Sequence, residues 1–223
     1  MFKNITSKNY AFISLVLSVI AGVIYNSWPL GYWLDRSTFK YGLASDLEKV
    51  HHPYYWLFIT LDCMTGLIIL IMAYINHNKL GKVLHKKRLN YVNLGLVIFA
   101  VFTIIAALLP SECSITPILR CRSIAGNGLG IDALTSTIAA LGLFVSLVAV
   151  RYLSLHHNLK PWIHNLTQTI FVLWIISGLS FIYIAFTSIS THLIQQILLI
   201  LSGAIIILVG INIYKIVISN EPI

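Results

Sequence analysis

One carboxylate lies inside a long apolar run, at Asp62 in the segment PYYWLFITLDCMTG. Asp62 comes six residues after Trp56, so a helix would place it about 9 Å below an aromatic belt at the membrane surface. An acid at that depth costs about 2.5–3.5 kcal/mol on insertion scales and usually faces the bundle interior or water. Asp62 is therefore the first candidate for contact with a proton, a cation or a ligand. A protonated Asp62, or one hydrogen-bonded across helices for packing, is the structural alternative.

Four further residues complete a predicted ligand-binding set on the same side of the membrane: Trp28, Trp33, Asp46 and Asp132. The tryptophans come from the aromatic segment NSWPLGYWLD, and function tends to lie on long ordered loops of this kind. Asp132 opens a later apolar run after the glycine-rich GNGLG. Its alternative role is a helix N-cap, in which its side-chain oxygen accepts hydrogen bonds from exposed backbone amides.

Histidines on this side raise the question of a metal site. His51 and His52 precede Pro53, and His192 lies in a short turn between the last two apolar runs. Together with Asp46, Glu48 and Asp62, they have the side-chain chemistry for zinc. Adjacent histidines seldom ligate one ion, however, so the sequence favours no cofactor, with zinc as the alternative.

Cys113 and Cys121 are eight residues apart in the segment PSECSITPILRCRS. A loop outside the cytoplasm experiences an oxidising environment, so the spacing predicts a disulfide bond that closes a small loop. Two free thiols, or an incomplete metal pair, are the alternatives. Cys63, inside the same run as Asp62, is expected to be an inert packing residue.

Composition indicates what must position these residues. Of 223 residues, 58% are hydrophobic and 10% are Asp, Glu, Lys or Arg, against about 45–50% and 25% in soluble domains. Lipid must therefore be the solvent for much of the chain. Runs of about 20 apolar residues cross a bilayer as helices. The sequence predicts an all-α polytopic membrane protein, a single domain over residues 1–223, with six transmembrane helices near Tyr10–Ser27, Tyr54–Asn76, Tyr91–Leu109, Asp132–Leu153, Leu166–Phe186 and Ile194–Lys215.

The distribution of Lys and Arg predicts the orientation of these helices. Ten of the fifteen basic residues flank the runs on the side of the two termini, and five lie on the other side. The positive-inside rule therefore predicts both termini in the cytoplasm. The charge of +8 is dispersed between apolar runs rather than gathered on one face, which argues against nucleic acid as a partner.

Small residues inside the runs recur at spacings that allow helices to approach closely. We expect them to pack helices within the chain, with a homo-oligomer as the alternative. The residues concerned are Ser18, Gly22, Gly142, Ser146, Gly203 and Gly210.

The aromatic segment NSWPLGYWLD, the step Ser45, Asp46 and Leu47, and the segment PYYWLFITLDCMTG resemble an uncharacterised family of six-span bacterial integral membrane proteins, catalogued as a domain of unknown function. The resemblance implies the six-span layout and a multi-pass protein of the bacterial cytoplasmic membrane. That layout is also loosely similar to membrane hydrolases of the alkaline ceramidase type, which bind zinc through histidines and an aspartate. This sequence departs from those hydrolases, because it lacks their H-x-x-x-H in a late span.

No reaction signature is present: the sequence contains no H-E-x-x-H, no G-x-S-x-G and no Walker loop. Whether the protein is an enzyme is left open. The sequence favours a membrane protein that binds a lipid or small solute in a polar cavity in the outer half of the bundle. The alternatives are a membrane-embedded metal-dependent lipid hydrolase and a proton-coupled transporter that uses Asp62.

Overall fold

The computed structural model describes residues 6–34, 47–48, 52–81, 83–84, 86–109, 131–157, 159–187 and 192–220. Within these ranges the chain is helical and contains no strand. The six long apolar helices predicted from the sequence are confirmed. They are α1 (Ser7–Tyr25), α4 (Tyr55–Ile75), α5 (Lys86–Leu108), α6 (Ile131–His156), α7 (Pro161–Thr187) and α8 (His192–Asn220).

Two short elements extend this pattern. After α1, the chain turns at Asn26–Trp28 and forms α2 (Pro29–Leu34), because proline is well tolerated in the first turn of a helix. After α4, the helix continues as a π-helical turn, η2 (Asn76–Leu80). Several helices also run past the predicted apolar ranges, and α8 continues to Asn220.

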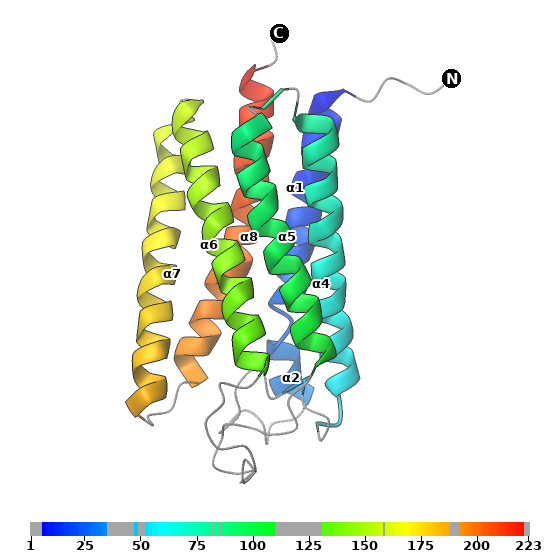
Figure 1. Ribbon diagram of the computed structural model, residues 1–223, viewed down its shortest axis with the longest axis vertical. Coiled ribbons are helices and arrows are strands. Elements are labelled where there is room, and N and C mark those ends of the chain that lie inside the picture. Colours follow the sequence, from blue (N-terminus) through cyan, green and yellow to red (C-terminus); the bar gives the residue numbers. More distant parts are fainter. Residues whose placement is uncertain are drawn as a thin grey trace, which may run out of the picture.

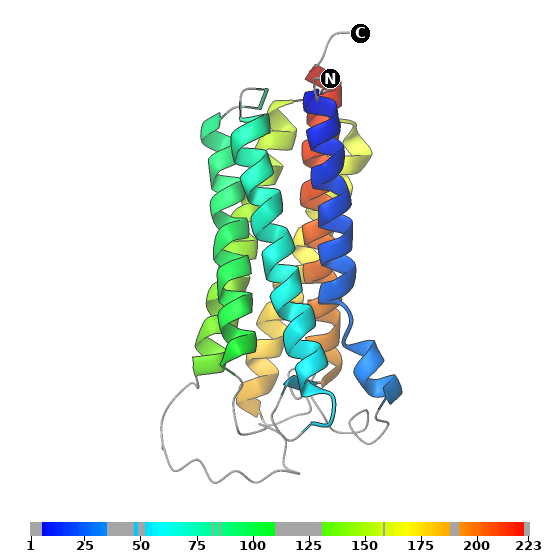
Figure 2. The same cartoon turned by 90° about the vertical axis from the view of Figure 1, so that its right-hand side faces the viewer.

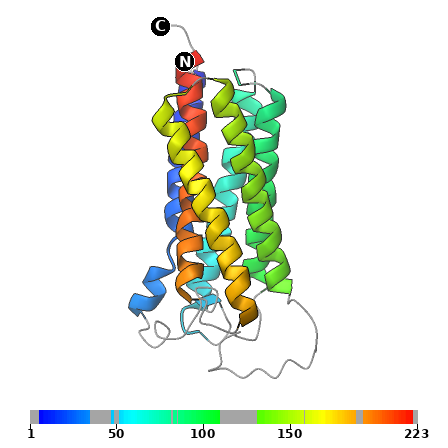
Figure 3. The ribbon, with the colours of Figure 1, turned by 90° about the vertical axis from the view of Figure 1, so that its left-hand side faces the viewer.

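The six long helices stand side by side in one bundle, with the first residues of α1 and the last residues of α8 at the same end (Figure 1). The element α2 lies at the opposite end. Helix α8 packs along α1 (Figure 2), and α4 packs against both α1 and α5. Helix α7 lies against α8, with a smaller contact to α6 (Figure 3).

Many large apolar side chains face outward from this bundle, among them Val23, Leu67, Ile176 and Leu179. A soluble monomer rarely exposes such continuous apolar surface, whereas a bilayer solvates it. All six long helices have the length and apolar character needed to cross a membrane. The chain is accordingly a multi-pass integral membrane protein.

Small residues bring the most closely packed helices together, as the sequence predicts. A Cβ atom on Gly95 of α5 would lie 2.5 Å from the Gly142 carbonyl oxygen of α6. The Ser146 hydroxyl donates a 2.6 Å hydrogen bond to the Val92 carbonyl across the same contact. On the other side of the bundle, a Cβ on Gly22 of α1 would lie 2.8 Å from the Gly203 carbonyl oxygen of α8. The close approach expected of these residues is confirmed.

The N-in/C-in orientation stays a prediction, and cysteine labelling tests it. Trp33 in α2 and Lys79 in η2 are both exposed, at opposite ends of the bundle. We expect a membrane-impermeant maleimide on intact cells to label Trp33→Cys several-fold above the parent chain, because the predicted orientation places α2 outside the cytoplasm. Lys79→Cys should gain label only after permeabilisation. If only Lys79→Cys were labelled from outside, the orientation would be the opposite of the predicted one.

Candidate functional site

Asp62 lies in the second turn of α4, in the half of the bundle nearest α2, and is partly buried. Its carboxyl group is joined by a side-chain hydrogen bond to Glu48, from the turn before α4. Tyr25, the last residue of α1, lies close enough to both acids to interact with them electrostatically. The Tyr25 ring also packs edge-on against Phe99 of α5, with 5.4 Å between ring centroids. Three segments thus meet at the carboxyl pair.

The hydrogen bond between two carboxyl groups has a chemical requirement. An ionised carboxylate only accepts hydrogen bonds, so one of the two groups must carry a proton that it donates to the other. Two carboxylates that were both ionised would instead repel each other. When this hydrogen bond is formed, the pair holds one exchangeable proton together with one position for negative charge. It is also suited to a bound cation, which would replace the shared proton.

The turn that carries Glu48 is held by its neighbour Leu47. Leu47 is only 1% exposed, and it packs against Gly31 of α2, where a Cβ atom would lie 2.5 Å from the Leu47 side chain. The same Cβ would lie 3.0 Å from the ring of Phe58 on α4. A side chain at position 31 would displace Leu47. Because residue 31 is glycine, α2 can pack closely enough to hold the turn against α4. Burial of Leu47 in turn presents Glu48 to Asp62.

Two other groups at this end of the bundle are available for hydrogen bonding. The Trp28 indole N–H and the Asn26 side-chain oxygen are buried and find no hydrogen-bond partner within the described part of the chain. The Asn26 amide nitrogen donates to the Gly22 carbonyl at 2.9 Å. Trp28 packs edge-on against Tyr32, with 5.6 Å between centroids. Buried polar groups without partners are infrequent in folded proteins, so these two mark the region around α2 as polar.

The structure does not bring the other predicted ligand-binding residues to the Glu48–Asp62 pair within the described part of the chain. Trp33 is 77% exposed, which fits a residue of the aromatic belt. Asp46 lies outside the described residues, and so does the side chain of Asp132. Helix α6 begins at Ile131, so Asp132 is its second residue and not the N-cap residue that the sequence suggests.

The predicted metal ligands are not brought together within the described residues, where no group of three His, Cys, Asp or Glu side chains could hold an ion. His51 and the side chain of His192 lie outside that part of the chain. The His52 ring accepts a 3.2 Å hydrogen bond from the Tyr54 amide and packs against Phe58. It thus contacts the first turn of α4. The zinc alternative stays a prediction.

The predicted disulfide gains no support from the structure. Cys113 and Cys121 both lie outside the described residues. Among the residues that are described, Cys63 is a free thiol and no cysteine pair is present. The bond therefore remains an expectation based on spacing and compartment.

Comparisons of the chain with protein families, with curated proteins and with solved structures found no match. The resemblances to a six-span bacterial family and to ceramidase-type hydrolases therefore stay expectations from short sequence segments. The candidate site is defined by its own geometry.

Proposed function

We propose that this integral membrane protein binds a small solute or a lipid headgroup at the Glu48–Asp62 pair, in the outer half of the bundle. The ligand class is one that carries a positive charge or several hydrogen-bond donors. The observation that carries the proposal is the side-chain hydrogen bond between two carboxyl groups from separate segments. It places the acids at one point, where a cationic group could contact both.

The energetics of the pair support a role in binding. A carboxyl group in the apolar part of a membrane protein is costly, and such groups usually mark ligand or ion pathways. Packing alone would be served as well by neutral partners, because amides and hydroxyls hydrogen-bond across helices without a charge. Two acids that share one proton retain a position for negative charge near Tyr25 and α2. A bound cation would remove the need for the proton.

A proton-coupled transporter is the second candidate. It is favoured by the same shared proton, because binding of a cation at the pair would release that proton. In this form of the proposal, Asp62 and Glu48 exchange a proton for substrate. The lipid-hydrolase alternative has no comparable support, since three suitable ligands do not meet within the described residues.

The proposal is tested by ligand-induced stabilisation of the purified protein in detergent. The probes are ammonium, guanidinium and choline, titrated separately while the melting temperature is recorded. A ligand at 100 times its Kd adds about 2.7 kcal/mol to the stability of the folded state. We expect at least one probe to stabilise the parent chain. Asp62→Asn should weaken that binding at least tenfold, or about 1.4 kcal/mol, because it removes one of the two carboxylates that a bound cation would contact.

Thr60→Val is the matched control. Thr60 is exposed on the same helix, and its hydroxyl donates to the Trp56 carbonyl at 2.7 Å. Its replacement should leave probe binding unchanged. The Asp62→Asn variant should itself melt within a few degrees of the parent chain, since an amide can take over the donor role. Equal stabilisation of this variant and the parent chain by every active probe would refute the proposal.

A further inference from the structure

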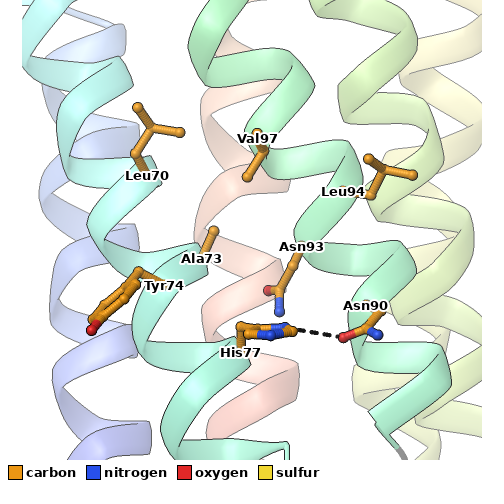
Figure 4. Close-up of a pocket in the computed structure, with 8 residues that line it drawn as sticks. All are labelled: Leu70, Ala73, Tyr74, His77, Asn90, Asn93, Leu94 and Val97. Atoms are coloured by element: carbon orange, nitrogen blue, oxygen red, sulfur yellow. Dashed lines mark hydrogen bonds between the residues drawn. The ribbon is translucent and has the colours of Figure 1, made fainter.

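A groove opens between α4 and α5 (Figure 4). Its lining residues on α4 begin at Leu70, eight residues after Asp62, towards the end of the helix away from α2. Its volume is about 440 Å³, within the range of roughly 300–1,000 Å³ that is typical of ligand sites. Towards the middle of the bundle it is lined by Leu70, Leu94 and Val97. At its other end it is lined by His77, Asn90 and Asn93. The surface of the groove is therefore almost entirely apolar, and its three polar lining residues lie together at one end.

Asn93 is the polar residue that needs explanation. The residue is only 6% exposed, yet neither its amide nitrogen nor its amide oxygen has a hydrogen-bond partner among the described residues. Its side chain is turned into the groove towards His77 (Figure 4). Leaving a buried polar group unpaired destabilises the folded state. A ligand with both an acceptor and a donor, or one with an acceptor and an ordered water, would satisfy the amide.

The His77–Asn90 pair lies at the same end of the groove as Asn93. The His77 Nδ1 atom lies 3.2 Å from the Asn90 Oδ1 atom. Because an amide oxygen only accepts, His77 donates from Nδ1 in this contact. The contact joins η2 to α5 close beside Asn93 (Figure 4), so two further polar side chains are fixed at the mouth of the groove.

The groove-facing side of α5 continues beyond Asn90 to positive charge. Lys86 and Lys87 are exposed and lie four and three residues before Asn90, which places them next to it on the helix surface. Along this side the order is cationic at Lys86 and Lys87, hydrogen-bonding at Asn90 and Asn93, and apolar at Val97. A phospholipid presents the complementary order of phosphate, ester groups and acyl chain.

Lys79, unlike Lys86 and Lys87, does not lie along the groove-facing side of α5. It lies at the same end of the bundle, but its ammonium group is 5.5 Å from the centre of the Tyr10 ring on α1. It is thus turned towards α1 rather than α5. Not every lysine at this end belongs to the groove, and Lys79 supplies a matched control.

We propose that the α4–α5 groove is a binding site for an anionic phospholipid. One acyl chain lies along Leu70, Leu94 and Val97, the ester oxygens accept from Asn93, and the phosphate lies near Lys86 and Lys87. Lysines close to a membrane surface are attracted to anionic lipids, as polybasic segments are. The site is at the opposite end from the Glu48–Asp62 pair and does not depend on the function proposed for that pair.

The test is native mass spectrometry of the delipidated full chain, titrated with phosphatidylglycerol or with phosphatidylcholine of the same acyl chains. We expect the parent chain to bind the first phosphatidylglycerol at least fivefold more tightly than phosphatidylcholine. Asn93→Leu removes the unpaired amide at similar volume, so it should weaken the first phosphatidylglycerol at least fivefold while the melting temperature stays the same or rises. Val97→Phe fills the groove and should weaken both lipids.

Two matched variants separate this site from general effects. Val19→Phe adds the same bulk on α1 at similar exposure, 40% against 37% for Val97, and should bind both lipids as the parent does. Lys86→Gln with Lys87→Gln should remove the preference for phosphatidylglycerol, whereas Lys79→Gln should keep it. Parent-like lipid binding by both Asn93→Leu and Val97→Phe would overturn the proposal. Displacement of phosphatidylglycerol by millimolar inorganic phosphate would also overturn it, because the site would then recognise a free anion and not a lipid.

Discussion

Gly142→Val is expected to lower the free energy of unfolding by about 3 kcal/mol, the upper end of the usual cost of overpacking. A Cβ atom at Gly142 would lie 2.6 Å from the Phe99 amide nitrogen and 2.7 Å from the Gly95 carbonyl oxygen of α5. Both are backbone atoms of a helix, so they cannot move aside as a flexible side chain can. Valine adds two methyl groups to this clash. The helices must separate, and the Ser146–Val92 hydrogen bond between them would be lost as well.

The measurement is unfolding in mixed micelles with increasing sodium dodecyl sulfate, followed by tryptophan fluorescence. Gly178→Val is the matched control, because a Cβ atom on Gly178 of α7 would have no atom of another described element within 4 Å. That variant should change the stability by no more than about 0.5 kcal/mol, as surface substitutions usually do. Similar losses in the two variants would show that the α5–α6 contact does not limit stability.

The second large effect is expected at the carboxyl pair. Glu48→Ala leaves the Asp62 carboxyl without its partner, and an unpaired buried group costs about 1–3 kcal/mol. Glu48→Gln should cost no more than about 0.5 kcal/mol, since the amide can donate the hydrogen bond that the carboxylic acid donated. Stability is measured as for Gly142→Val.

A double-mutant cycle isolates the interaction. Combining Glu48→Ala with Asp62→Ala should cost less than the sum of the two single changes, because the second change removes the group that the first left unpaired. We expect a coupling energy within the range of about 0.5–3 kcal/mol seen for contacting residues. Strict additivity, or equal losses in Glu48→Ala and Glu48→Gln, would mean that the hydrogen bond contributes nothing to the folded state.

The six helices were predictable because the bilayer imposes a length and an apolar composition that can be read from a single sequence. The ends of these helices were less predictable. The π-helical turn η2 continues α4 past the apolar run, where the Asn76 oxygen accepts a 2.8 Å hydrogen bond from the Ser14 hydroxyl of α1. That contact joins residues 62 positions apart, and no local pattern specifies it.

The candidate site was predictable only in part. Asp62 was identified because an acid in an apolar run is conspicuous. Glu48 was considered only as a metal ligand, although the apolar Leu47 beside it hinted at a buried turn. Its contact with Asp62 depends on the packing of the neighbouring Leu47 against Gly31 of α2, close to Phe58 of α4. That packing is tertiary, and no local sequence pattern specifies it. Tyr25 and Asn93 were missed, since each resembles an ordinary interfacial or packing residue until its neighbours are known.

The loose attachment of α7 bears on how the chain enters the membrane. Only 11% of its most apolar stretch is buried, against 50% for α8, and its hydropathy is the lowest of the six. Buried side-chain atoms of His164 and Gln168 have no partner in the described part of the chain, so these polar groups add to the cost of a lipid environment. The Trp174 indole N–H donates a 2.9 Å hydrogen bond to Ser202 of α8. We expect α7 to leave the translocation channel poorly by itself and to partition into lipid together with α8, as a hairpin completed only when synthesis has passed the last span.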